Sequence, residues 1–225
     1  DENGLEIGAS LNSPNLFGSA SSLSTWIRFG GATNMGVRFK YPWYPGSGWW
    51  SGHQADYFHV ERYNKIYQFN EKSDQLNLIW LPNIAHNLRL GPLLSYLSLA
   101  SDQTDITLDT DNSDKILGIG MSFQLDSRDL RTYPTKGWWS EILISYYGGN
   151  ANYWQGNLDI RRYFRLGRAK NSLACYALTT ITSGQVNTDI PKYLQFNIGG
   201  TNSVRGWNLG SREGKNQFLN TVEYW

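Results

Sequence analysis

A strict two-residue alternation runs through Ile116–Asp126 and limits what this chain can fold into. The apolar parity holds Leu117, Ile119, Met121, Phe123 and Leu125. The other parity holds Gly118, Gly120, Ser122, Gln124 and Asp126. Successive side chains of a β-strand point to opposite faces, so the segment predicts a strand with one apolar and one polar face.

The same alternation returns between Asn152 and Phe164. The apolar parity holds Trp154, Leu158, Ile160 and Phe164, and the other holds Tyr153, Gln155, Asn157, Asp159, Arg161 and Tyr163. A soluble β-sandwich and a membrane barrel both produce such a pattern. The alternating segments reach about 9 to 11 residues or more, the length of a tilted membrane-spanning strand, whereas soluble strands average about 5 or 6. Length therefore favours the barrel.

The composition supports the same interpretation. Aromatic residues make up 15% of the 225 residues, which fits the interfacial aromatic girdles of a barrel. No run of 18 apolar residues occurs, which excludes a transmembrane helix. The net charge of +1 argues against nucleic acid as a partner. The single Cys175 excludes an intrachain disulfide.

The pattern predicts an all-β fold with about twelve strands and no helix. The predicted strands are Gly4 to Asn12, Ser24 to Gly31, Met35 to Trp43, Tyr57 to Phe69, Gln75 to Ala85, Leu88 to Ala100, Ile116 to Asp126, Trp138 to Tyr147, Asn152 to Arg165, Ser172 to Thr182, Lys192 to Gly199 and Gln217 to Trp225. The connections Pro82 to Asn87 and Arg165 to Lys170 look short, while Trp43 to Asp56 and Asp102 to Asp114 look long. Short turns on one side and long loops on the other are typical of outer-membrane barrels.

A second informative segment is Gly199–Trp207, in which a glycine pair precedes Val204, Arg205, Gly206 and Trp207. Inside a polar barrel lumen the arginine can pair with wall carboxylates, the glycine lets the backbone approach the wall, and the ring packs. A β-turn with an exposed arginine is the simpler alternative.

Two motifs together carry a family resemblance. The first is Asp126-Ser127-Arg128-Asp129 followed by Tyr133-Pro134-Thr135-Lys136-Gly137; the second is Gly199-Gly200 with Val204-Arg205-Gly206-Trp207. With the strand-like Phe218 to Tyr224, they make Leu117 to Trp225 resemble the carboxy-proximal part of the BamA/TamA-like superfamily of outer-membrane barrels, the bacterial surface antigen family. The first half of the chain is similar only in its strand rhythm.

The resemblance implies a transmembrane antiparallel up-and-down β-barrel in the outer membrane of a Gram-negative bacterium. One domain over residues 1–225 is expected, with an inward-folded loop around 199–212. Members of this superfamily that insert or secrete proteins usually carry periplasmic POTRA domains before the barrel. Strand pattern here begins close to Asp1, so the chain is expected to be either a barrel-only member without POTRA domains or a barrel from which an N-terminal domain has been removed. The family barrel usually has sixteen strands, so the chain is expected to be either a twelve-stranded barrel or the first twelve strands of a sixteen-stranded one. If Glu223 faces the lumen, as its charge requires, then Phe218, Val222 and Tyr224 face lipid and Trp225 points inward with Glu223.

The resemblance also suggests the site residues. The matching arginine of the family is held in the lumen by acidic residues, and the candidate partners of Arg205 here are Glu223, Asp159 and Asp126. Asp126, Arg128, Pro134 and Gly137 are expected to fix a connection between two strands rather than to catalyse. Arg205→Ala is expected to lower the heat stability of the barrel or to free the loop.

Catalysis and metal binding have little support in the sequence. The segment Asp102 to Asp114 begins like a calcium loop but has no Gly at the sixth position and no Glu at the twelfth. His53, His59 and His86 are too scattered for a zinc site, and no Gly-x-Ser-x-Gly elbow occurs. We therefore expect no enzyme activity, no metal and no cofactor.

Two functions remain open. One is insertion or translocation of proteins or lipids at the outer membrane, with outer-membrane lipids, unfolded outer-membrane proteins, periplasmic subunits or a second copy of the chain as partners. The other is a passive channel or structural barrel.

Overall fold

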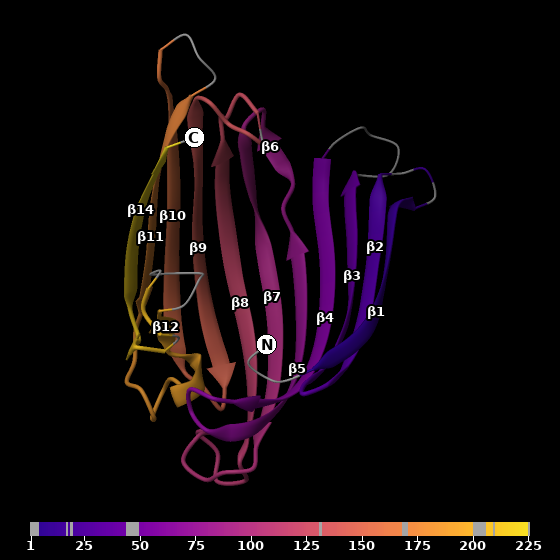
Figure 1. Ribbon diagram of the computed structural model, residues 1–225, viewed down its shortest axis with the longest axis vertical. Helices are drawn as coiled ribbons and strands as arrows, with labels where there is room; N and C mark the ends of the chain where they lie inside the picture. The colour runs from indigo at the N-terminus through magenta and orange to yellow at the C-terminus, as the bar shows by residue number, and fades with distance from the viewer. Residues whose placement is uncertain are drawn as a thin grey trace.

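The computed structural model describes residues 5–16, 18, 20–43, 50–130, 132–167, 171–199, 206–208 and 210–224. Its main feature is one antiparallel sheet of twelve strands in which nearly every strand pairs with its neighbours in sequence (Figure 1). The strands are β1 (Glu6–Leu16), β2 (Ser21–Gly30), β3 (Thr33–Trp43), β4 (Trp50–Asn64), β5 (Phe69–Trp80), β6 (Asn83–Ala85), β7 (Leu88–Ser101), β8 (Ser113–Asp126), β9 (Gly137–Gly149), β10 (Tyr153–Arg165), β11 (Ser172–Thr182) and β14 (Gln217–Tyr224). No helix in these ranges is long and apolar enough to cross a membrane.

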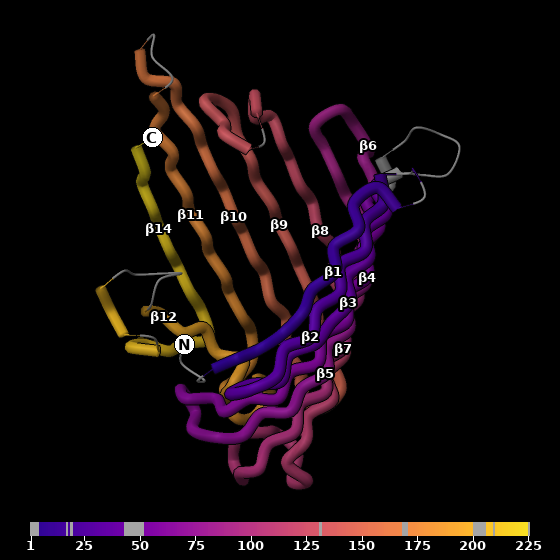
Figure 2. Tube along the Cα trace, turned by 45° about the vertical axis from the view of Figure 1, so that its right-hand side comes forward, coloured from indigo at the N-terminus to yellow at the C-terminus, as the bar shows by residue number. Residues whose placement is uncertain are grey.

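The sheet curves into a trough and does not close on itself. Figure 2 shows β1 and β14 standing apart at the upper end of the trough. The strand order runs from β1 to β14, and no ladder joins these two edge strands within the described ranges. The all-β antiparallel prediction is confirmed, but one edge of β1 and one edge of β14 are left without a strand partner in this sheet.

The two faces of the sheet follow the predicted parity. In β8, Leu117 and Ile119 are 60% and 56% exposed on the convex face, whereas Ile116 and Ser122 are 2% and 4% exposed on the concave face. Phe218, Val222 and Tyr224 of β14 are likewise exposed. An apolar convex face and a more polar concave face are what a membrane barrel wall requires.

Three predicted segments are wrong in detail. The hairpin turn between β4 and β5 lies at 65–68 rather than after Phe69, because Glu71 pairs with Arg62 across the ladder at 3.2 Å and stays in the strand. The strand expected over Gln75 to Ala85 is interrupted after Trp80, since Pro82 has no N–H to give to a ladder.

The third error is the strand expected over Lys192 to Gly199. A 3-10 turn, η1 (Lys192–Leu194), follows Pro191, and a short strand, β12 (Phe196–Ile198), pairs with β13 (Arg212–Gly214) in a separate two-stranded sheet. This segment therefore belongs to the connection between β11 and β14, and β14 pairs directly with β11.

Alternate connections lie at opposite ends of the sheet. The upper end in Figure 1 carries the connections that follow β1, β3, β5, β8 and β10, among them 81–87, 127–136 and 166–171. The lower end carries the connections 31–32, 65–68, 102–112, 150–152 and 183–216. The predicted long connection Trp43 to Asp56 is wrong in two respects. It lies at the upper end with the connections 81–87 and 166–171, which the sequence predicts to be short, and it is shortened because β4 begins at Trp50. The predicted separation of short turns from long loops is also wrong, because the lower end carries the two longest connections, 102–112 and 183–216, together with the short connections 31–32, 65–68 and 150–152.

Candidate functional site

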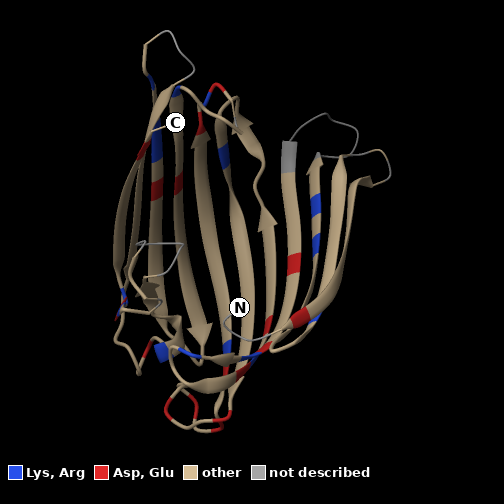
Figure 3. Ribbon diagram, viewed as in Figure 1, with Lys and Arg blue, Asp and Glu red and all other residues tan. Residues whose placement is uncertain are grey.

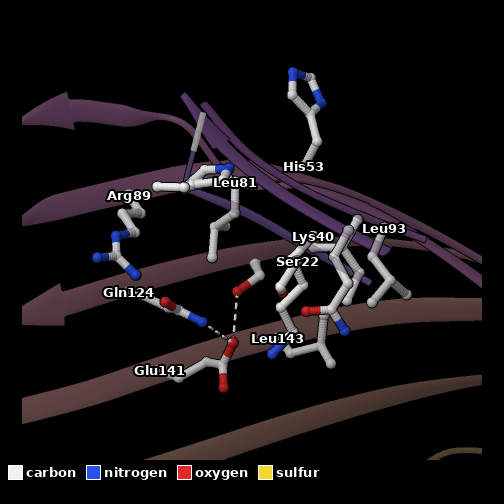
Figure 4. Close-up of a pocket in the computed structure, with 15 residues that line it drawn as sticks. Ser22, Lys40, His53, Leu81, Arg89, Leu93, Gln124, Glu141 and Leu143 are labelled. Carbon is white, nitrogen blue, oxygen red and sulfur yellow. Dashed lines mark hydrogen bonds between the residues drawn. The ribbon is translucent and has the colours of Figure 1, made fainter. Parts of the chain in front are cut away.

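The concave face carries a polar cluster centred on the Glu141 carboxylate of β9. Ser122 Oγ donates to Glu141 Oε1 at 2.7 Å, and Gln124 Nε2 donates to the same oxygen at 2.6 Å. Figure 4 shows Arg89 pointing into the same space from the next strand. Two donors from β8 thus fix one carboxylate on β9, which holds a charged group in place on the concave face.

A cavity of about 440 Å³ lies above this cluster. Its walls include Ser22, Lys40, Ile79, Arg89 and Glu141, contributed by strands from both halves of the sheet. A second cavity of about 190 Å³ shares Arg89 and Gln124 with the first and continues toward Asp126 and Arg128. The lining of the first cavity mixes these polar groups with apolar side chains such as Leu93 and Leu143.

The connection over 127–136 is fixed at both of its ends. Arg128 Nε and Nη2 donate to the two carboxylate oxygens of Asp126 at 2.8 and 3.0 Å. Pro134 is buried, and Gly137 has a φ of +108°, with its hypothetical Cβ only 2.3 Å from the Ser127 carbonyl oxygen. This geometry favours the structural role expected for these four residues.

Asp129 organises the middle of the same connection. Its carboxylate accepts hydrogen bonds from Thr135 Oγ1 and from the backbone N–H groups of Leu130, Thr135 and Lys136. Desolvation opposes its ionisation, but these hydrogen bonds outweigh it and hold the pKa of Asp129 well below its usual range. The ionised Asp129 side chain therefore stabilises the turn through these four hydrogen bonds.

The predicted lumen motif is described only in part. Val204 and Arg205 lie outside the described residues, whereas Gly206 has a φ of +86° and Trp207 is 53% exposed. Two of the candidate partners of Arg205 pair with other arginines: Asp126 with Arg128, and Asp159 with Arg161 at 2.7 Å.

Glu223, the third candidate, lies opposite Ala174 in the ladder between β11 and β14. The pairing of Arg205 with any of the three acids stays a prediction.

A contact that the sequence did not predict anchors the 183–216 connection to the wall. Tyr193 Oη donates to Asp114 Oδ2 at 3.0 Å, and the fully buried Asp114 also accepts from the backbone N–H groups of Leu108 and Asp109. Burial and the neighbouring carboxylate raise the pKa of Tyr193, so the hydroxyl keeps the proton that it donates. One carboxylate thus joins β8, the 102–112 connection and the 183–216 connection.

Apolar packing surrounds this anchor. Phe69, Leu99 and Ile106 form a buried cluster against which Tyr193 packs. A second cluster brings Ile190 and Leu194 against wall residues, Ile116 and Tyr153 among them. Residues 190–194 therefore cover the lower end of the concave face.

The acidic segment of the 102–112 connection is engaged in local hydrogen bonds. Figure 3 shows acidic residues gathered in the lowest loop of the molecule. Asn150 Nδ2 donates to Asp109 at 2.7 Å, and the backbone N–H of Ser113 donates to Asp111 at 2.8 Å. Within the described ranges, no group of three or more His, Cys, Asp or Glu residues is arranged to hold a metal ion.

The three histidines occupy separate places. His53 stacks on Trp80 with ring centroids 6.0 Å apart, His59 Nδ1 lies 2.8 Å from Asp74 Oδ1, and His86 lines the second cavity. The structure therefore does not bring them together.

Comparison with known proteins agrees with this architecture. One similar solved structure is that of BamA from Haemophilus ducreyi lacking POTRA domains 1–3, with a TM-score of 0.72 and 16% sequence identity over 93% of this chain and 44% of that one. The present chain thus spans less than half the length of that protein, and the likeness concerns the fold. The comparison with curated protein sequences gives no match.

The family model identifies the chain more firmly. Residues 15–224 match the Omp85 superfamily domain, which covers most of the chain. The resemblance to this superfamily of bacterial outer-membrane β-barrels is therefore confirmed, and it extends into the first half of the sequence, where only strand rhythm was visible. The chain belongs to the Omp85 superfamily.

Proposed function

We propose that this chain forms the wall of an outer-membrane barrel that helps to insert or translocate proteins or lipids. The observations that carry the proposal are the match of residues 15–224 to the Omp85 superfamily domain and an antiparallel wall whose sheet is open between the edges of β1 and β14 in the described residues. An edge of this kind accepts a further strand, whether from the same chain, a second copy or a client.

The edges gain importance in a membrane. Lipid offers no hydrogen-bond partners, so each unpaired backbone group in the hydrocarbon region costs several kcal/mol. A client strand that pairs with β14 would remove this cost while keeping the alternation of Phe218, Val222 and Tyr224 toward lipid. Unfolded outer-membrane proteins are therefore the clients we favour, with periplasmic subunits as the means of delivery.

The proposal is tested by the folding of a small client barrel added unfolded to vesicles that contain this protein. We expect the folded fraction, read from the heat-dependent gel mobility of the client, to rise faster than in vesicles that hold a passive barrel at the same protein-to-lipid ratio. That control accounts for packing defects in the bilayer. Equal rates would overturn the proposal.

Two neighbouring proline variants sharpen the test. Successive residues of a strand direct their N–H groups to opposite edges, so one of Asn220 and Thr221 donates toward β11 and the other toward the free edge. Proline at the free-edge position should leave the protein folded but slow the client, because it removes a donor from the docking edge. Proline at the other position should disrupt the ladder with β11.

A passive barrel is the second candidate, favoured by the packing of residues 190–194 over the lower end of the concave face. A lumen closed in this way is suited to a structural protein or a narrow channel. Steady ion conductance in planar bilayers, together with no effect on client folding, would support this alternative.

A further inference from the structure

Arg162 of β10 lies on the convex face, which in an outer-membrane barrel is the face toward lipid. It shares its parity with Leu158 and Phe164, which are 36% and 42% exposed. In the ladders it lies opposite Trp138 of β9 and Cys175 of β11. The residues two before and two after it on the same face, Ile160 and Phe164, are apolar, so the charge is set within the apolar surface.

The neighbouring residue has a different environment. Arg161 points to the concave face and donates to Asp159 Oδ2 at 2.7 Å. Arg162 has no carboxylate partner in the part of the chain that the structure describes. Its guanidinium carbon instead lies 4.4 Å from the centroid of the Trp138 ring and 5.1 Å from that of Phe164.

Other outward cations lie at the opposite end of the apolar surface. Lys72 Nζ lies 2.8 Å from Glu61 Oε1. Lys115 is near the start of β8, where the preceding outward residue is Ser113 and the outward apolar residues begin only at Leu117. Among the outward-facing cations of the described wall, Arg162 is thus the one whose outward neighbours before and after it on the same strand are both apolar. A charge there is costly unless an anion meets it.

We propose that Arg162, Trp138 and Phe164 form a binding site for the phosphate of a membrane phospholipid. The two rings hold the guanidinium by cation–π contacts, and its planar fork of N–H donors matches phosphate oxygens. The acyl chains would then lie along Ile160 and Leu158, toward the middle of the wall.

The position of the site agrees with this ligand. Outer-membrane barrels have short periplasmic turns and longer extracellular loops. The two longest connections, 102–112 and 183–216, are at the lower end, which also carries the short turns 31–32, 65–68 and 150–152, and we assign the lower end to the extracellular side on the two long connections. Arg162 is near the upper end of β10, close to the 166–171 connection. The site therefore faces the periplasmic leaflet, whose lipids are phospholipids.

The test measures binding of phosphatidylglycerol to the full chain in neutral detergent, by native mass spectrometry. We expect Arg162→Gln to weaken the tightest binding of this lipid at least tenfold, and Arg162→Lys to recover part of it, because lysine keeps the charge without the planar fork. Lys115→Gln, which removes an outward cation at the other end, should leave it unchanged. Gel mobility with and without heating confirms that each variant is folded.

Unchanged phosphatidylglycerol binding by folded Arg162→Gln would overturn the proposal. If that variant does not fold, Trp138→Leu replaces it, with a several-fold loss expected and no loss contradicting the site. Displacement of phosphatidylglycerol from the unaltered protein by excess inorganic phosphate would show a general anion site instead of a lipid site and would also overturn it. Client folding does not enter this test, so its outcome is independent of the proposed function.

Discussion

The anchor between Tyr193 and Asp114 gives the sharpest prediction. Tyr193→Phe removes one hydrogen bond to a carboxylate that is 0% exposed and leaves the Leu108 and Asp109 N–H groups in place. Hydrogen bonds to charged groups contribute about 1.5–3 kcal/mol. A loss of about 2 kcal/mol raises the open population of the 183–216 connection about thirtyfold, at 1.4 kcal/mol per tenfold.

Limited trypsin digestion of the folded protein in detergent measures this opening. The connection contains Lys192, Arg205, Arg212 and Lys215 as cleavage sites, and the cleavage rate follows the open population when reclosing is fast. Tyr224→Phe is the matched control, because it makes the same chemical change at an exposed hydrogen bond with Asn171 near the upper end. Equal cleavage of the Tyr193→Phe and Tyr224→Phe proteins would refute the anchoring role.

Three further predictions concern the wall and the 127–136 connection. The pKa of Asp129 is lowered in the folded protein, so its carboxylate stabilises the 127–136 connection fully above the unfolded pKa of about 4, and this stabilisation is lost as pH falls through the folded value. Acid should therefore increase proteolysis near Thr135 in the unaltered protein, and Asp129→Asn should abolish this acid-dependent increase. Gly137→Ala should destabilise by more than about 1 kcal/mol, measured by thermal melting, because its Cβ would meet the Ser127 carbonyl at a positive φ; an unchanged melting curve would contradict this. Ile119→Arg should cost about 2–4 kcal/mol in urea titrations in vesicles if the residue is near the bilayer midplane, and no cost would place the convex face away from lipid.

The wall could be predicted from the sequence because its information is local. Alternation in Ile116–Asp126 and Asn152–Phe164 fixes which side chains face lipid, and the observed exposures follow it. The errors occur where a local signal is ambiguous. A charged residue such as Glu71 resembles part of a turn until its cross-strand partner is known. Pro191 stands directly before a segment that resembles a strand, and a 3-10 turn follows it instead.

The site was less accessible to sequence reasoning. The Asp126–Arg128 pair is predictable from the sequence because both residues belong to one motif. Asp114 belongs to an acidic run in the sequence, and its hydrogen bond with Tyr193 joins residues 79 positions apart, so no periodicity indicates this contact. The ring contacts of Arg162 depend on the register between β9 and β10, which alternation alone does not determine.

The long connection before β14 has a consequence for the order of assembly. Most wall strands meet their partner through a short turn, so hairpins can add one after another along the chain. Closing a flexible loop costs about 0.6 kcal/mol more for each doubling of its length, so closing 183–216 costs about 2 kcal/mol more than closing 65–68. Contacts at long sequence separation also form slowly. β14 is therefore expected to join the wall late, after η1 has docked on the lower end and shortened the span that remains to be closed.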